Sequence, residues 1–152
     1  MKILVVGGNF AGATAALELK RKLKDTVEVT LIDRNENFVY IPSLIWVPIK
    51  RREVSEIIIP RKQVLEKKGV KFVLDTAIKV EPDENKVYCE NGTYEYDHLI
   101  IATGPKVNFD IAPGIKENAC YIGTPPGAMH TREKLEEFKQ NPGSIVIGAT
   151  QN

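Results

Sequence analysis

The chain has 152 residues, of which 43% are hydrophobic and 27% are charged, a balance typical of a folded domain with a buried core. Its 21 Lys and Arg residues almost cancel its 20 Asp and Glu residues, and the net charge of +1 excludes an overall field that would attract nucleic acid or an anionic membrane. The longest apolar run, residues 38–49, contains two prolines and is shorter than the roughly 20 residues that a membrane-spanning helix needs.

The number of cysteines and the first residues of the chain narrow the class of protein further. Cys89 and Cys120 are too few for a disulfide scaffold, and neither has a Cys or His nearby at zinc-binding spacing. We therefore predict no metal site, and each cysteine is either a reactive thiol or a core residue. Met1 and Lys2 lead directly into an apolar run without a signal-peptide pattern, so we expect a cytoplasmic protein that does not bind nucleic acid.

The first 33 residues predict a strand, a helix and a second strand. Residues 2–6, KILVV, are apolar and end at a glycine pair, which is typical of a buried parallel strand. The next stretch has apolar residues at helical spacing and should form a helix that ends near Asp25. Residues 27–33 alternate and end on an acid. This order predicts a βαβ unit with a right-handed crossover.

The turn between the first strand and the helix resembles a dinucleotide fingerprint. Gly7 allows the tight turn, the helix N-terminus offers free N–H groups to a pyrophosphate, and Gly12 allows close packing of helix on strand. Asp33, at the end of the second strand, can accept a hydrogen bond from a ribose 2′-hydroxyl and would repel a 2′-phosphate. A glycine-rich turn in an unrelated α/β protein is the alternative. The loop residues are Gly7, Gly8, Asn9, Phe10, Ala11 and Gly12.

Asn9 is the departure from the fingerprint, because the middle position usually holds a glycine. Backbone must come close to phosphate there, so the side chain of Asn9 has to point away. If the position has a positive φ, Asn is the least costly replacement for Gly. Asn9 therefore weakens the fingerprint without removing it.

The middle of the chain predicts a short helix followed by strands. Pro60 suits the first helical turn and Gly69 ends the helix. Asn91-Gly92 between alternating runs is a strong hairpin signal. The final run, HLIIATG, ends in a glycine turn and is expected to be buried. The predicted elements are a helix over residues 60–68 and strands over 70–74, 77–82, 86–91, 93–97 and 98–104.

The last third combines an irregular segment, a helix and a strand. Residues 104–131 are rich in proline and glycine and indicate an ordered connection. We predict a helix from Arg132 to Gln140, capped by Thr131. From Ser144 the sequence SIVIGATQN predicts a strand that enters a glycine turn.

Together the glycine fingerprint, Asp33 and the turn of Ala102, Thr103 and Gly104 resemble the FAD domain of the pyridine nucleotide-disulfide oxidoreductase superfamily. The resemblance implies an α/β, Rossmann-like FAD-binding domain over residues 1–112, with a parallel sheet and an inserted antiparallel meander. It implies that residues 113–152 form a connection and the first elements of an incomplete second dinucleotide-binding domain. FAD is the implied cofactor, with the Ala-Thr-Gly turn beside the flavin.

Within the superfamily the chain is most similar to the sulfide:quinone oxidoreductases and the flavoprotein of flavocytochrome c sulfide dehydrogenase. The similarity rests on NFVYIPSLIWVPIKRRE, on ENACYIGTPPGAMHTREKLEEF leading into GSIVIGATQN, and on the lack of a Cys-x-x-x-x-Cys pair. It implies that Cys120 is the first redox cysteine, acting with further cysteines beyond this chain, and that sulfide and quinone are the substrates. The same resemblance assigns further cofactor contacts to Arg34, Pro42, Ala77 and Ile78.

Several alternatives stay open. Cys120 can instead be a small buried residue at a strand end, and Cys89 is expected to be a non-catalytic thiol. The chain can also be part of an NADH dehydrogenase-like flavoprotein, or a non-catalytic dinucleotide-binding fragment. Because the resemblance implies a longer protein, we expect an N-terminal portion that is inactive alone. Membrane contact would occur only through a missing C-terminal region. The sequence is compatible with a homo-oligomer as well as with a monomer.

Overall fold

The computed structural model describes residues 1–111 and 113–148, apart from the side chain of Ile111. The chain forms two compact units. The first unit contains residues 1–39 and 58–107, and the second contains residues 40–57 and 108–152. Each unit is described by itself below.

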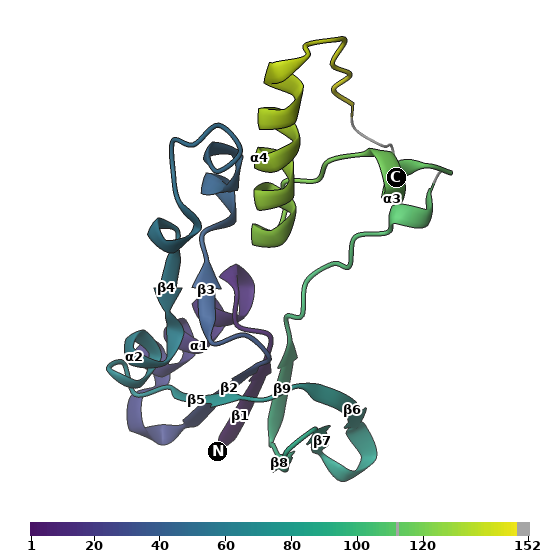
Figure 1. Cartoon of the computed structure of the whole chain (residues 1–152). Coiled ribbons are helices and arrows are strands. Elements are labelled where there is room, and N and C mark those ends of the chain that lie inside the picture. The colour runs from purple at the N-terminus through teal and green to yellow at the C-terminus, as the bar shows by residue number, and fades with distance from the viewer. Residues whose placement is uncertain (112, 149–152) are drawn as a thin grey trace. The chain divides into compact units, whose positions relative to one another are not determined.

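A four-stranded parallel sheet is the centre of the first unit (Figure 1). The first strand runs next to the second and the last, so that Val5 pairs with Leu31 on one side and with Ile100 on the other. This confirms the predicted α/β class and the βαβ unit. In spatial order the strands are β5 (Lys71–Leu74), β2 (Glu28–Asp33), β1 (Lys2–Val6) and β9 (His98–Ile101).

Alternation along the strands divides the apolar side chains of this unit into two clusters. Val5 lies on one face and packs with α1 (Phe10–Leu23), while Leu65 of α2 (Arg61–Glu66) belongs to the same cluster. Val6 lies on the opposite face and packs against the antiparallel strands. The unit therefore has helices, a parallel sheet and a meander as three layers. The meander consists of β6 (Ala77–Glu81), β7 (Lys86–Cys89) and β8 (Thr93–Glu95).

The predicted hairpin at Asn91-Gly92 is confirmed by the antiparallel pairing of β7 with β8. The Cys89 N–H donates to the Gly92 carbonyl at 2.8 Å. The buried Asp75 accepts from both the backbone N–H and the side-chain amide of Asn91, at 3.2 and 3.1 Å. Asp75 thereby ties the end of β5 to the hairpin. The connecting turns include the 3₁₀ helices η1 (Lys24–Thr26) and η4 (Pro82–Glu84).

Two features of the first unit differ from the sequence prediction. β3 (Asn37–Val39) pairs antiparallel with β4 (Ile58–Pro60), and neither was predicted because three residues are too few to show a period. The prediction of a buried strand ending in HLIIATG was wrong in its burial, since Ile101 is 62% exposed. β9 lies at the edge of the described sheet, where it has one neighbouring strand and so only partial cover.

The second unit is built from short helices and one long helix. Its long helix, α4, packs near η2, the first 3₁₀ helix of this unit. The Arg132 guanidinium of α4 donates to the carbonyls of Val47 at 2.8 Å and Arg52 at 2.9 Å, in the segment after η2. Arg132 also forms an ion pair with Glu53 at 2.9 Å. The elements are η2 (Ile41–Trp46), η3 (Val54–Glu56), η5 (Phe109–Ile111), α3 (Ile115–Asn118) and α4 (Pro125–Gln140).

The predicted start of the last helix was wrong. α4 begins at Pro125, and the Gly127 N–H donates to the side chain of the N-cap Thr124 at 3.2 Å. Thr131 lies inside the helix and donates to the Gly127 carbonyl at 2.8 Å, so it is not the cap. Proline favoured a loop in the sequence, but the first helical turn accepts proline because its N–H groups have no intrahelical partner.

The strand predicted from Ser144 is not present over residues 144–148, and residues 149–152 with the glycine turn lie outside the described part. Val146 and Ile147 are each 93% exposed. A strand forms by pairing, and the described residues offer this segment no ladder partner. Across the described ranges, none of the helices combines the length and the apolar character that would let it span a bilayer.

Candidate dinucleotide-binding site

Three parallel strands of the first unit end at one edge of the sheet and place two predicted motifs together. The Gly7 N–H donates to the carbonyl of Ile32 at 2.8 Å, so the glycine loop lies beside the end of β2. The Ala102 N–H donates to the carbonyl of Val6 at 2.7 Å, which places the Ala-Thr-Gly turn on the other side of the loop. In open α/β sheets ligands bind outside these carboxyl ends.

The close packing at this edge explains why glycine occupies two of the loop positions. Gly7 has a φ of +95°, and a Cβ there would overlap the carbonyl oxygen of Ala102 and lie 2.9 Å from the Cα of Thr103. A Cβ on Gly12 would overlap the Gly7 carbonyl oxygen. The two motifs therefore approach each other through backbone atoms at the N-terminus of α1. No acidic side chain lies in the first turn of α1.

Asn9 does not have the positive φ at which Asn would be the least costly replacement for Gly. Its φ is −83° and its ψ is −150°, the extended geometry of an N-cap residue, and its carbonyl accepts from the Ala13 N–H at 2.9 Å. The positive φ of the loop falls on Gly7 instead, so Asn9 causes no backbone strain. Its side-chain Oδ1 is buried and has no hydrogen-bond partner among the described residues. An amide placed here is able to turn toward a polar ligand.

The neighbouring loop residues Phe10 and Ala11 are exposed at the start of α1. The Phe10 ring packs edge-on against Phe38 of β3, with 4.9 Å between the ring centroids. This contact places the β3–β4 ribbon next to the glycine loop within the first unit. Phe10 is 43% exposed, so part of an aromatic surface lies beside the N-terminus of the helix.

Asp33 is held at the end of β2 by two backbone N–H donors and one ion pair. Its Oδ2 accepts from the Gly8 N–H at 2.5 Å, and its Oδ1 accepts from the Asn35 N–H at 2.7 Å. The Arg61 guanidinium lies 3.2 Å from Oδ1. Each carboxylate oxygen has two lone pairs, so Oδ2 keeps one acceptor position for a hydroxyl of a ligand. The carboxylate is therefore beside the glycine loop, as predicted, and able to accept.

Arg61 is a site residue that the sequence analysis missed. It is 4% exposed and lies at the first position of α2, far from Asp33 in the chain. The sequence offered one weak signal: Arg61 and the apolar Leu65 are four residues apart, so they share one face of a helix. A basic residue at helical spacing from a core leucine is usually exposed, so the pattern alone did not distinguish it.

The remaining predicted contacts divide between the two units. Arg34 is exposed directly after β2, Ala77 packs against the apolar cluster under the meander, and Ile78 is 67% exposed. These three lie in the first unit with the loop. Pro42 is exposed in η2 of the second unit.

The two cysteines have opposite environments. Cys120 is exposed in the irregular segment between α3 and α4, so its interpretation as a buried residue at a strand end was wrong. Cys89 is buried at the end of β7, and burial, assisted by the charge of Asp75, raises the pKa of its thiol to about 11. The Cys89 thiol is therefore protonated near neutral pH and packs as a core residue.

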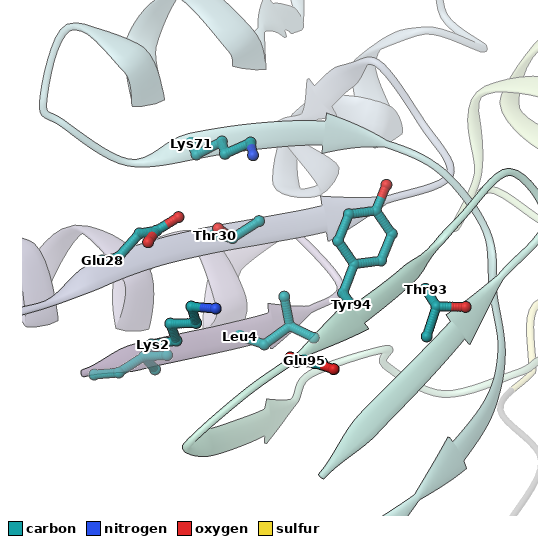
Figure 2. A pocket seen from close by; sticks show the side chains of 9 residues that line it. Lys2, Leu4, Glu28, Thr30, Lys71, Thr93, Tyr94 and Glu95 are labelled. Atoms are coloured by element: carbon teal, nitrogen blue, oxygen red, sulfur yellow. The ribbon is translucent and has the colours of Figure 1, made fainter. Parts of the chain in front are cut away.

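A pocket of about 350 Å³ lies at the other end of the strands (Figure 2). Lys2, Glu28 and Lys71, the first residues of β1, β2 and β5, line it together with Tyr94 and Glu95 of β8. Its two lysines and two glutamates balance in charge. No predicted cofactor residue contributes to its walls, and the amino ends of parallel strands are not where these sheets bind ligands. The candidate site is therefore the carboxyl edge.

The sequence profile of the pyridine nucleotide-disulphide oxidoreductase family matches residues 1–150. A sulfide-quinone reductase of Aquifex aeolicus (strain VF5) is 36% identical over 148 residues, which are 97% of this chain and 34% of that relative. A type II NADH:quinone oxidoreductase of Staphylococcus aureus (strain NCTC 8325 / PS 47) is 29% identical over 158 residues, 97% of this chain and 39% of the relative.

Among solved structures, the sulfide:quinone oxidoreductase from the hyperthermophilic bacterium Aquifex aeolicus superposes with a TM-score of 0.87 at 34% sequence identity. The superposition covers 93% of this chain and 33% of that chain. The chain thus spans about a third of the length of the relatives it matches. This similarity confirms the predicted fold, a Rossmann-like domain with a parallel sheet and an antiparallel insertion.

Proposed function

The chain belongs to the pyridine nucleotide-disulphide oxidoreductase family, and from that premise we propose that it binds FAD and forms the flavin-binding part of a sulfide:quinone oxidoreductase. The observation that carries the proposal is the backbone contact between Gly7 and the turn of Ala102 and Thr103, with Asp33 beside it. Two motifs separated by about ninety residues in sequence meet there as one site.

The residues at this edge fit the cofactor. The open N-terminus of α1, with no acid in its first turn, offers N–H groups and a positive dipole end to a pyrophosphate. The Asn9 Oδ1, which is buried and has no hydrogen-bond partner among the described residues, lies in the same loop, and turning this amide would aim its NH₂ donors at a pyrophosphate. Asp33 accepts from a ribose hydroxyl through the free position on Oδ2. FAD, when bound, supplies the capacity to take up an electron pair and pass it to a quinone.

For the sulfide chemistry we propose Cys120 as the sulfur-carrying residue. The net reaction turns hydrosulfide, quinone and one proton into zero-valent sulfur and quinol. Hydrosulfide attacks the Cys120 sulfur while this sulfur is in a disulfide; a new S–S bond forms, the old one breaks, and the displaced thiolate leaves with the electron pair. Exposure of Cys120 supports the assignment, because the attacking anion needs access.

Titration of the purified chain with FAD, followed by flavin absorbance and fluorescence, tests the cofactor part. We expect saturable binding of one FAD per chain and its loss in Gly12→Ala, whose added methyl overlaps the Gly7 carbonyl. Gly143→Ala is the control, because a Cβ there meets nothing within 4 Å. A wild-type chain that binds no FAD would refute the proposal.

Persulfide formation tests the role of Cys120 separately. The chain is first oxidised with glutathione disulfide to form the mixed disulfide, and hydrosulfide is then added. We expect mass spectrometry to find a mass gain of one sulfur atom on Cys120 and none on the buried Cys89. Cys120→Ser should abolish the product. If hydrosulfide converts the mixed disulfide only to the free Cys120 thiol, and no persulfide forms, the assignment is contradicted.

A second candidate is an NADH:quinone oxidoreductase, favoured by the 29% identity to the Staphylococcus aureus enzyme. The two functions differ in their electron donor. In the complete protein that contains this chain, reduction of bound flavin by hydrosulfide but not by NADH supports the first, and the reverse supports the second. In that complete protein, binding of FAD without reduction by either donor supports a non-catalytic dinucleotide-binding role.

A further inference from the structure

Arg61 has contacts that its place on a short helix does not require. Among the described residues, Arg61 and Asp75 are the two charged side chains with less than a tenth of their surface exposed. Burial of a cation is costly unless it is paired and hydrogen-bonded. The hydrogen-bond and ion-pair partners of the Arg61 side chain all lie between Asp33, at the end of β2, and Asn37, at the start of β3.

The guanidinium holds this segment at three points. Its Nη1 donates to the Asn35 carbonyl at 2.5 Å and lies 3.2 Å from the Asp33 carboxylate, and its Nη2 donates to the Asn37 carbonyl at 3.0 Å. The planar group also lies over the Phe72 ring, 5.7 Å from its centroid. Arg61 therefore fixes both the carboxylate and the backbone on which the carboxylate stands.

The same side chain also contacts the glycine loop. A Cβ on Gly8 would lie 3.1 Å from the Arg61 Nε, so the stem of the arginine fills the space behind the loop. This Nε has no hydrogen-bond partner among the described residues, although it is buried. The buried, unpaired Nε destabilises this position of the side chain. The contacts that hold Arg61 in place are therefore those with Asp33 and the residues that follow it.

The orientation of Asp33 follows from this arrangement. Arg61 and the Asn35 N–H occupy Oδ1, and the Gly8 N–H occupies one position of Oδ2. The free acceptor position is left on the oxygen that touches the glycine loop. Without Arg61, the carboxylate is able to rotate toward water, since the other two donors are single backbone N–H groups.

We propose that Arg61 is a positioning residue of the dinucleotide site, which fixes Asp33 so that it recognises the hydroxyls of an adenosine ribose. The inference rests on the proposed binding of FAD. Arg61 does not touch the ribose in this account; it determines which carboxylate oxygen the ribose meets. A ligand that carries the hydroxyls is therefore preferred over the same ligand without them.

The test compares the dissociation constants of ADP and 2′,3′-dideoxy-ADP, measured by calorimetry or by competition with FAD. For the wild-type chain we expect ADP to bind about tenfold more tightly, the value of one hydrogen bond to a charged acceptor. In Arg61→Met the preference should fall to about twofold or less. Arg132→Met is the matched control, because Arg132 also binds two carbonyls and a carboxylate but lies in the other unit.

The ratio of the two constants separates positioning from a structural role. A variant that only loosens the fold weakens both ligands equally, so its ratio stays at the wild-type value. Asp33→Asn should lose the preference as Arg61→Met does, and combining the two substitutions should reduce it no further. An unchanged ratio in Arg61→Met would overturn the inference, even when the wild-type chain binds FAD. Failure of the wild-type chain to bind FAD instead refutes the proposed function.

Arg61→Lys keeps the test valid if Arg61→Met does not fold. Lysine retains the charge but cannot bind Asp33, the Asn35 carbonyl and the Asn37 carbonyl together, so an intermediate preference is expected. Amide hydrogen exchange in the ligand-free chain gives a second readout. The N–H groups of Gly8 and Asn35 donate to Asp33 and should be protected in the wild type and exchange faster in Arg61→Lys. Equal exchange in both proteins would overturn the inference.

Discussion

Each unit contains an arginine that joins distant segments of the chain, but the two arginines have different surroundings. Arg61 is 4% exposed, and its carboxylate partner Asp33 is 11% exposed. Arg132 is 13% exposed, and its partner Glu53 is 58% exposed. Both guanidinium groups bind two backbone carbonyls. The bonding pattern is thus similar, while the cost of losing it depends on how much water can replace the missing group.

The apolar core of the first unit also contains more fully buried side chains than the core of the second unit. In the first unit two clusters cover both faces of a four-stranded ladder, and side chains such as Val5 and Leu31 are fully buried. In the second unit the fully buried apolar residues described are few, with Leu44, Val47 and Ala128 among them. The apolar core stabilises the first unit, so Arg61 is not needed to join its elements and can serve to orient Asp33 at the binding edge. In the second unit the arginine itself joins α4 to the segment around η2.

Replacing the two arginines by methionine gives the largest expected contrast. In Arg61→Met the carboxylate of Asp33, which is 11% exposed, loses its buried counter-charge, and we expect the free energy of unfolding to fall by about 3 kcal/mol. In Arg132→Met water reaches Glu53 and the freed carbonyls, so we expect a loss of about 1 kcal/mol. Urea unfolding followed by circular dichroism measures both. Equal losses would break the comparison.

Two glycines of the binding edge give the next effect. Gly7→Ala combines a positive φ with overlap onto Ala102, and we expect a loss of about 3 kcal/mol or less in stability together with loss of FAD binding. Gly104→Ala has a similar φ of +73° but meets nothing within 4 Å, so a loss of about 1 kcal/mol is expected. Thermal unfolding of both variants measures the difference. A similar loss in both would show that close packing at Gly7 is unimportant.

These contrasts indicate how far sequence reasoning reaches in each unit. In the first unit, periodicity and glycine spacing predicted the strands of the parallel sheet, the helix α1 and the carboxyl edge around Gly7 and Asp33, because these features follow from local sequence patterns. Arg61 was missed since its partners lie more than twenty residues away, and a buried arginine has the same local pattern as an exposed one. In the second unit, where pattern is weak, the start of α4 at Pro125 was also missed.

Cys89 and Cys120 extend the comparison to pH and thiol chemistry. Burial raises the pKa of Cys89 to about 11, so the folded state holds the proton more tightly than the unfolded state, whose thiol titrates near 8.5. This contribution to stability is therefore complete below about pH 8.5 and is lost as the pH rises through about 11. Burial also raises the pKa of Tyr94, which adds to the same slope.

Unfolding by urea at several pH values measures this slope, and Cys89→Ala should reduce it while Cys120→Ala should not. Iodoacetamide at pH 8 should modify the exposed Cys120 in the folded chain, and Cys89 only after unfolding. Equal modification rates would contradict the burial of Cys89 and remove the contrast between the two thiols.

The smallest expected effect concerns Glu136 on the surface of α4. Hydrogen bonds from Lys139 and then Lys50 lower the pKa of Glu136 to about 2. A lowered pKa stabilises the folded state above the ordinary value of 4.5, and this contribution is lost as the pH falls through about 2. Because both partners are solvated, we expect Lys50→Ala to raise the titration midpoint of Glu136, measured by NMR, while the melting temperature at neutral pH barely changes. A large drop in melting temperature would mean that the second unit depends on surface charge pairs and not on Arg132.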